Sequence, residues 1–278
     1  MKFRILVDGG TDLPKHLIDD PNYKIIPVTL TVGDKVFASN ETFDQKEFLK
    51  VMKESQSSPR SACPSPEDYM KEFDGEEDTF VITVSSELSG SYNSALLAKR
   101  LYLEENPRKN IEVIDSKTAS VGQTLIAMKI RELIQQGHLF GDIVEKIKVF
   151  RSEIKTMFVL ENLENLRKSG RLSNLKAIIA NALNIKPIMG GTPEGTICKL
   201  DQARGITKAL KTMAEIIEKD VINPQKRILG IAHCNCIERA HYIKEEILKM
   251  VPFKDSFIVD TAGVSTMYAN EGGIIVAY

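Results

Sequence analysis

The chain has 278 residues, of which 42% are hydrophobic and 27% are charged, and its formal net charge at pH 7 is −1. This length supports one large domain or two smaller ones, and a net charge near zero gives no reason to expect a nucleic acid as partner. No apolar run reaches the length of a membrane span, and the apolar start at residues 5–7 is too short for a signal peptide. We therefore expect a cytoplasmic protein with at most transient membrane contact.

The first half of the chain alternates predicted strands with predicted helices. Apolar, β-branched stretches predict strands at 3–7, 24–32, 35–37, 80–84 and 111–114. Apolar residues at helical spacing and turn signals predict helices at 44–54, 67–73, 94–101, 120–136 and 141–152. This rhythm predicts an α/β/α domain over residues 1–155, built on a parallel sheet with helices on both faces.

The second half has a different pattern, in which close pairs of strands mix with longer crossovers. Strands are expected at 157–160, 185–189, 196–200, 228–233, 256–260 and 273–278. Helices are expected at 174–183, 205–219 and 236–250. The pattern predicts a second α/β domain over residues 156–278, with a mixed sheet and helices mainly on one face.

The stretch 85–95, SSELSGSYNSA, follows a predicted buried strand and precedes a predicted helix. Turns at the carboxyl ends of parallel strands bind ligands in open α/β sheets. The hydroxyls of Ser85 and Ser86, with free N–H groups at a helix start, can hold a small anion. Because the stretch contains no Lys or Arg, a single carboxylate is favoured over a triphosphate. The alternative is that these serines only cap the helix.

The chain has four cysteines, at positions 63, 198, 234 and 236. They are too few and too scattered for a disulfide framework. The sequence His233-Cys234-Asn235-Cys236 is the one local cluster of possible metal ligands. Zinc sites usually place two to four residues between their cysteines, and no second pair of ligands follows. We therefore expect no metal, and we interpret these cysteines as structural.

Several segments together resemble the DegV family, the bacterial fatty-acid-binding proteins that act with a fatty acid kinase. The matching segments, in the order of the family and spread over most of the chain, are 8–14, 61–66, 85–95, 115–120 and 160–173. The resemblance implies an α/β/α domain and a second α/β domain, with a long-chain fatty acid in an apolar tunnel between them. It also implies a carrier that performs no chemistry of its own, needs no cofactor, and presents the carboxylate to a separate ATP-dependent kinase.

The resemblance also assigns roles to individual residues. Ser61, Ser85 and Ser86 stand at positions that contact the carboxylate in the family, and Tyr268 stands roughly where the family carries a His. Arg204 resembles a family Arg near the mouth of the tunnel, implicated in dealing with the kinase or the acyl phosphate.

The basic turn 167–171, RKSGR, is a further candidate site. Arg167 and Arg171, with Arg204, can contact an acidic partner or a phosphate. A solvated basic loop explains the same residues equally well.

A small-metabolite enzyme is the alternative to a carrier, because the fold class also resembles a domain of dihydroxyacetone kinases. Asp8, Asp12 and Asp115 end predicted strands and can serve as acids or bases. Capping and turn formation explain these three aspartates about as well. His16 and His138 fall on or near helix ends and are poorly placed to capture a substrate.

Overall fold

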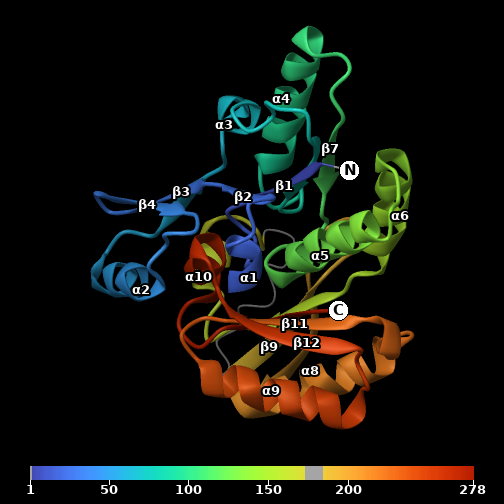
Figure 1. Ribbon diagram of the computed structural model, residues 1–278. Coiled ribbons are helices and arrows are strands. Elements are labelled where there is room, and N and C mark those ends of the chain that lie inside the picture. The colour runs from blue at the N-terminus through green and yellow to red at the C-terminus, as the bar shows by residue number, and fades with distance from the viewer. Residues whose placement is uncertain (1, 173–183) are drawn as a thin grey trace.

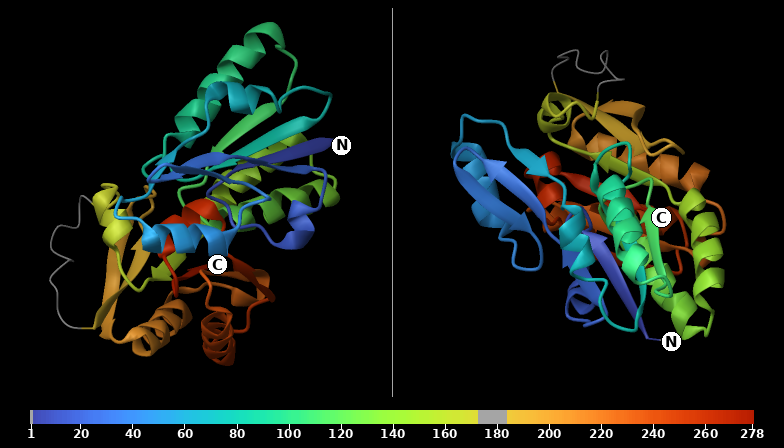
Figure 2. Two further views of the ribbon diagram at one scale, coloured as in Figure 1. Left: turned by 90° about the vertical axis from the view of Figure 1, so that its left-hand side faces the viewer. Right: turned by 90° about the horizontal axis from the view of Figure 1, so that it is seen from above.

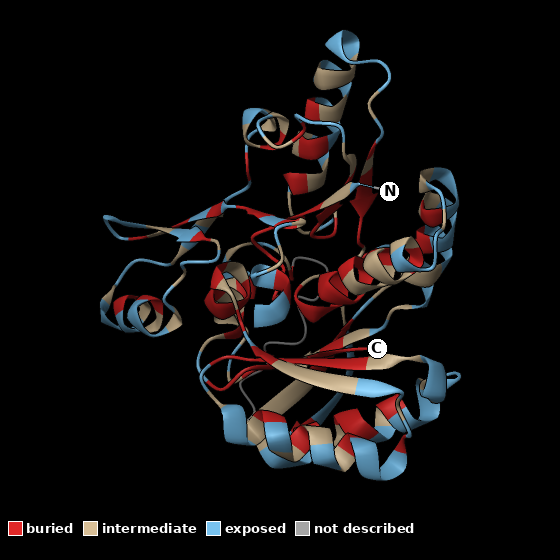
Figure 3. Ribbon diagram, viewed as in Figure 1, coloured by how far each residue is buried: buried red, intermediate tan, exposed pale blue. Residues whose placement is uncertain are grey.

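The computed structural model of the protein describes residues 2–172 and 184–278, and it contains three β-sheets. The helix expected at 174–183 lies outside the described residues. In Figure 3 the buried residues concentrate on two of the sheets and on the helix faces that cover them. Among the described residues, no helix combines the length and the apolar character needed to cross a bilayer.

Sheet A is a four-stranded parallel sheet in the order β2-β1-β6-β7. Its strands are β1 (Phe3–Asp8), β2 (Tyr23–Ile26), β6 (Asp78–Thr83) and β7 (Ile111–Asp115). The side chains of β1 alternate between the two faces, as strand geometry requires. Ile5 and Val7 point to one hydrophobic cluster and Leu6 to another.

Helices cover both faces of sheet A. One face packs on α1 (Lys15–Ile18), α5 (Val121–Gln135) and α6 (Phe140–Glu153). The other face packs on α3 (Pro66–Met70) and α4 (Ser91–Glu105). The prediction of an α/β/α arrangement around a parallel sheet is confirmed.

Sheet B is small and antiparallel, in the order β4-β3-β5, and it differs from the prediction. It consists of β3 (Val28–Val32), β4 (Lys35–Ser39) and β5 (Arg60–Ala62), flanked by α2 (Gln45–Glu54). The single strand expected at 24–32 is in fact two strands, β2 and β3, in different sheets. The break falls at Pro27, which has no N–H to give to a ladder.

Sheet C is a mixed sheet in the order β10-β9-β8-β13-β11-β12. Its strands are β8 (Thr156–Val159), β9 (Ile185–Gly191), β10 (Ile197–Arg204), β11 (Ile228–His233), β12 (Asp255–Asp260) and β13 (Ile274–Ala277). The pair β11–β12 is parallel and the other pairs are antiparallel. The predicted mixed sheet is confirmed.

One face of sheet C packs on α8 (Ile206–Asp220) and α9 (Ile237–Met250), with the short 3-10 helix η2 (Pro224–Lys226) between them in the chain. The other face packs on α5, through Val121 and Leu125. Helix α5 therefore lies between sheets A and C (Figure 1). All strands of sheets A and B precede residue 155 and all strands of sheet C follow it; a domain boundary at that point stays a prediction.

Two short helices complete the fold, α7 (Glu164–Lys168) and α10 (Gly263–Ala269). The stretch containing α10 was not predicted to be helical. Helix α10 contacts α2, α7 and sheet B (Figure 2). Its first residue must be small, because a Cβ on Gly263 would lie 2.7 Å from Leu30 Cδ1 and from Ser39 Oγ. Sheet B, α7 and sheet C thus meet around one short helix.

Candidate functional site

A cavity of about 410 Å³ lies where the carboxyl ends of the sheet A strands face sheet C and α10. The turns after β1, β6 and β7 contribute Gly10, Val84 and residues 117–120 to its wall. Strand β5 contributes residues 61–62, and α10 contributes four residues, Val264, Ser265, Tyr268 and Ala269. The cavity therefore sits at the edge of a parallel sheet where open α/β folds bind ligands.

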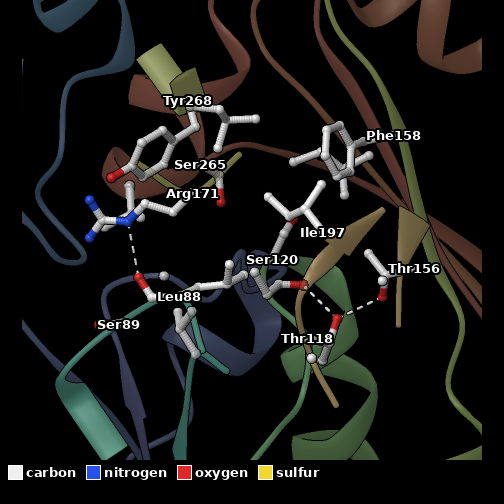
Figure 4. A pocket seen from close by; sticks show the side chains of 18 of the residues that line it. Leu88, Ser89, Thr118, Ser120, Thr156, Phe158, Arg171, Ile197, Ser265 and Tyr268 are labelled. Carbon is white, nitrogen blue, oxygen red and sulfur yellow. Dashed lines mark hydrogen bonds between the residues drawn. The ribbon is translucent and has the colours of Figure 1, made fainter. Parts of the chain in front are cut away.

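Apolar side chains form much of the cavity wall. They come from sheet C, from the chain on either side of β8, from the turn after β6 and from α7: Leu88, Ile154, Phe158, Leu160, Leu166, Ile197 and Ile275. In Figure 4, Phe158 and Ile197 lie together on the side away from Arg171 and Tyr268. This side of the cavity is suited to hydrocarbon.

Hydroxyl groups also line the cavity, and they come from turns, from strands, from the start of α4 and from α10. They belong to Ser61, Ser89, Ser91, Thr118, Ser120, Thr156, Thr192, Thr196 and Ser265. Some are bonded to one another: Ser89 Oγ lies 3.0 Å from Ser91 Oγ, and Thr118 Oγ1 lies 2.6 Å from Thr156 Oγ1. Ser120 adopts φ 59°, a conformation that non-glycine residues rarely adopt.

Ser85 and Ser86 are not among the residues that line the cavity. Ser85 is fully buried, and its Oγ donates to the carbonyl of Gly195 at 2.8 Å. Ser86 Oγ donates to Asp115 Oδ2 at 2.5 Å. Their contact with a carboxylate stays a prediction, and the structure gives each hydroxyl a partner within the chain.

Ser61 and Tyr268, the other two predicted ligand contacts, both line the cavity. Ser61 pairs with Leu30 in the β3–β5 ladder, which places its side chain at the edge of sheet B. The Tyr268 ring lies under the guanidinium of Arg171, 5.9 Å from ring centre to Cζ. The structure therefore brings these two predicted residues to the same cavity.

The three predicted basic contacts separate in the structure. Arg171 lines the cavity, where its Nε donates to the Leu88 carbonyl at 3.1 Å and its Nη1 to the Ser169 carbonyl at 2.9 Å. Arg167 is exposed and pairs with Glu164 at 2.8 Å. Arg204 is exposed at the end of β10. A role of all three in contacting a partner or a phosphate stays a prediction, but only Arg171 adds charge to the cavity.

Two buried carboxylates lie directly behind the cavity wall. Asp8 is fully buried, and burial raises its pKa although Gln123, Val84 and Gly10 donate hydrogen bonds to it. Asp12 is also fully buried, and burial raises its pKa to about 6. Within residues 2–172 and 184–278, neither carboxylate forms an ion pair.

Asp115 has a different environment from the other two strand-end aspartates. Its Oδ2 lies 2.8 Å from Lys117 Nζ, and it accepts hydrogen bonds from Ser86. Burial acts to raise the pKa of this carboxyl, but the bonds from Lys117 and Ser86 outweigh burial and lower it. Asp115 is therefore a charged partner of Lys117.

The cluster around His233 lies outside the cavity. Burial lowers the pKa of His233 and raises the pKa of the Cys234 thiol to about 12, so both groups are neutral at pH 7. Among the described residues, no group of three or more His, Cys, Asp or Glu side chains is arranged to hold a metal ion.

Comparison with known proteins identifies the family. The model of the DegV family, described as "uncharacterised protein, DegV family", matches residues 2–278. The chain belongs to the DegV family. A DegV domain-containing protein of Streptococcus gordonii is 36% identical over 280 residues, which cover 100% of this chain and 99% of the relative. The resemblance found in the sequence is confirmed.

Solved structures of DegV proteins share the whole fold. A DegV protein of Ruminococcus gnavus, refined with vaccenic acid, has a TM-score of 0.97 and 44% identity, covering 100% of this chain and 99% of that one. The fatty acid kinase (Fak) B3 protein of Streptococcus pneumoniae, loaded with linoleic acid, has a TM-score of 0.90 and 34% identity, with 100% and 99% covered.

Several cavity-lining residues of this DegV protein were not predicted from its sequence. Ser89 and Ser91 lie within the stretch that was singled out, but the strand-end pair Ser85–Ser86 was chosen instead. Ser120 and Ser265 are far apart in the chain, and they come together because Ser120 and the Ala262 amide at the start of α10 both bond to Asp12, in the turn after β1. The signal for Ser120 in the sequence was its place in the polar turn 115–120, which follows a predicted parallel strand.

Proposed function

We propose that this DegV protein binds a long-chain fatty acid in the cavity between sheet A and sheet C. The observation that supports this most strongly is the cavity itself, which is lined by both apolar side chains and hydroxyl groups. Its volume of about 410 Å³ lies in the range of small-molecule sites. Two DegV relatives with the same fold are solved with vaccenic acid and with linoleic acid.

Burial of the hydrocarbon tail supplies the free energy of binding. Each buried CH₂ group contributes ~0.8 kcal/mol, so the tail of a long-chain acid contributes of order ten kcal/mol before ordering costs. The tail would lie on Phe158, Ile197 and Ile275.

The carboxylate would lie against the hydroxyl groups of the cavity wall, close to Arg171. Ser61, Tyr268 and Arg171 are the predicted residues that we place in direct contact with the head group, because all three line the cavity. Ser85 and Ser86 would support the site indirectly, by holding the β9–β10 turn and Asp115 in place.

We further infer that the protein is a carrier, not a catalyst, that it acts in the cytoplasm, and that it presents the carboxylate to a separate ATP-dependent kinase. A relative that is 34% identical is named as a fatty acid kinase B3 protein, which supports a kinase partner. Arg167 and Arg204 are exposed outside the cavity and are the proposed contacts with that partner.

The test begins with gentle purification, solvent extraction and mass spectrometry of the bound lipid. We expect a fatty acid in the extract, and we expect the delipidated protein to bind acids of 14 to 18 carbons. An empty protein that binds none of these acids would refute the proposal. Hydrolysis of ATP by the isolated protein would refute the carrier role while leaving lipid binding intact.

A further inference from the structure

We propose that Asp12 is a positioning residue that couples fatty acid binding to the uptake of one proton, through the hydroxyls of Ser120 and Ser265. This inference rests on the proposed binding of a fatty acid in the cavity. It concerns a group that does not touch the ligand but controls which way two ligand-facing hydroxyls can point.

Asp12 lies at the junction of three parts of the fold. Its Oδ2 accepts a hydrogen bond from Ser120 Oγ, at the start of α5. Its Oδ1 accepts from the Ala262 amide at 2.6 Å, at the start of α10. The Ser265 hydroxyl of α10 lies close enough to Asp12 to act to lower the pKa of this carboxyl. Ser120 and Ser265 both line the cavity (Figure 4). Asp12 does not line it and is fully buried.

The direction of these hydrogen bonds follows from the charge of Asp12. An ionised carboxylate has no proton to donate, so a hydroxyl bonded to it must be the donor. Ser120 then gives its single proton to Asp12 and offers only lone pairs to the cavity. The charge of an ionised Asp12 attracts the proton of Ser265 in the same way. A ligand carboxylate also offers only lone pairs, so it finds no donor at either hydroxyl.

One added proton on Asp12 removes this conflict. A protonated Asp12 needs one acceptor, and it can donate to Ser120 Oγ. Ser120 is then free to donate its own proton into the cavity, toward the ligand carboxylate. The chain of donors would run from Asp12 through Ser120 to the ligand, with the proton taken from the solvent when the acid binds.

The surroundings of Asp12 favour this uptake. The ionisable groups that face it are the Asp260 carboxyl at the end of β12 and the Cys234 thiol after β11. Asp260 repels its negative charge, and Cys234 stays neutral because burial holds its pKa at about 12. Asp260 itself lies 3.5 Å from His233. Burial raises the pKa of Asp12 to about 6, so most of the empty protein carries an ionised Asp12 at pH 7.5.

The test uses the full-length, delipidated protein and two probes, myristic acid and its neutral analogue tetradecanol. For myristic acid we expect Kd to rise by up to about tenfold per pH unit between pH 6 and pH 8, as linkage to one proton requires. Calorimetric titrations in buffers of different ionisation enthalpy should report uptake of about one proton at pH 7.5. Tetradecanol should show neither effect, because its hydroxyl can donate to the existing acceptors.

Asp12→Asn separates this coupling from protonation of the ligand itself. The Asn amide keeps the shape of Asp12, accepts from the Ala262 amide and donates to Ser120 at every pH. We expect this variant to bind myristic acid with a Kd that is flat between pH 6 and pH 8. A matched control, Asp19→Asn, changes an exposed aspartate paired with Lys15 and should keep the wild-type slope.

The possible outcomes separate the two proposals. A flat pH profile for wild-type protein, or a slope that survives in Asp12→Asn, would overturn the role of Asp12 while leaving fatty acid binding intact. Failure of the wild-type protein to bind myristic acid at any pH would overturn the proposed function. If Asp12→Asn does not fold, the proton count of the wild-type protein alone decides, and a count of zero overturns the coupling.

Discussion

Replacement of Ser85 by Ala tests whether this serine binds the ligand or holds the fold. Its hydroxyl is fully buried, donates to the Gly195 carbonyl at 2.8 Å, and accepts from the Glu87 amide at 3.3 Å. Gly195 lies in the β9–β10 turn, so this bond joins sheet C to the end of β6. Its removal leaves a carbonyl without its donor, which costs about 1–3 kcal/mol. We therefore expect Ser85→Ala to lower the free energy of unfolding by this amount.

The assay is unfolding in urea combined with calorimetric titration of myristic acid. In a parallel thermal melt, the midpoint of unfolding, Tm, should fall by about 2–4 °C for each kcal/mol lost in a chain of about this size. The Kd should change by less than about threefold, which is well under 1 kcal/mol, because Ser85 does not line the cavity. Ser152→Ala is the control, since it removes an exposed hydroxyl that donates to the Val149 carbonyl at 2.7 Å. Unchanged stability with binding weakened more than tenfold would show that Ser85 contacts the carboxylate.

Two further predictions concern charge. Arg171→Gln removes the cavity-wall cation that forms no ion pair with a carboxylate among the described residues, and it should weaken myristic acid binding by about tenfold, the value of one charge-assisted hydrogen bond. Arg167→Gln on the exposed turn should leave Kd unchanged in the same titration. Equal effects of the two substitutions would contradict the placement of Arg171. The folded protein holds the Asp12 proton more tightly than the unfolded chain, because the pKa of Asp12 rises from 3.8 to about 6 on folding. The free energy of unfolding of the wild type, relative to that of Asp12→Asn, should therefore fall by about 3 kcal/mol as pH rises from about 4 to 6. Urea unfolding at pH 4 and pH 7 checks the sign, and an unchanged difference would contradict it.

Much of the fold was predictable because its core strands and long helices carry strong periodic patterns. The strand expected at 228–233 has those bounds in the structure, and the helix expected at 236–250 differs by one residue at its start. The failures lie where local pattern and tertiary pairing disagree. Residues 24–32 look like one strand, but Pro27 sends the chain from sheet A to sheet B. Strand β5 is three residues long and exists only because β3 pairs with it.

The candidate site was less predictable, because serine is common at helix starts and turns for reasons unrelated to ligands. The sequence pointed to the edge of sheet A where the cavity lies and to Ser61 and Tyr268, which line it, but not to Ser89, Ser91, Ser120 or Ser265. Ser85 and Ser91 are six positions apart and indistinguishable by residue type. One points to Gly195 and the other into the cavity. Only the position of sheet C against sheet A decides between them.

The charged residues around the cavity also affect how a ligand carboxylate is held. The sequence predicted a head-group site of neutral hydroxyls, because the stretch 85–95 contains no basic residue. The structure brings Arg171 to Leu88, 83 positions earlier in the chain, and so adds a cation. The same region contains the buried carboxyls of Asp8 and Asp12, whereas Asp115 is neutralised by Lys117. Because Lys117 is paired with Asp115, Arg171 is the other cation among the described residues that line the cavity, and it must balance the ligand carboxylate together with any charge on Asp8 and Asp12. Uncompensated buried charge costs several kcal/mol. A proton taken up by Asp12 as the ligand binds removes one negative charge from this region, so proton uptake lowers the electrostatic cost of binding.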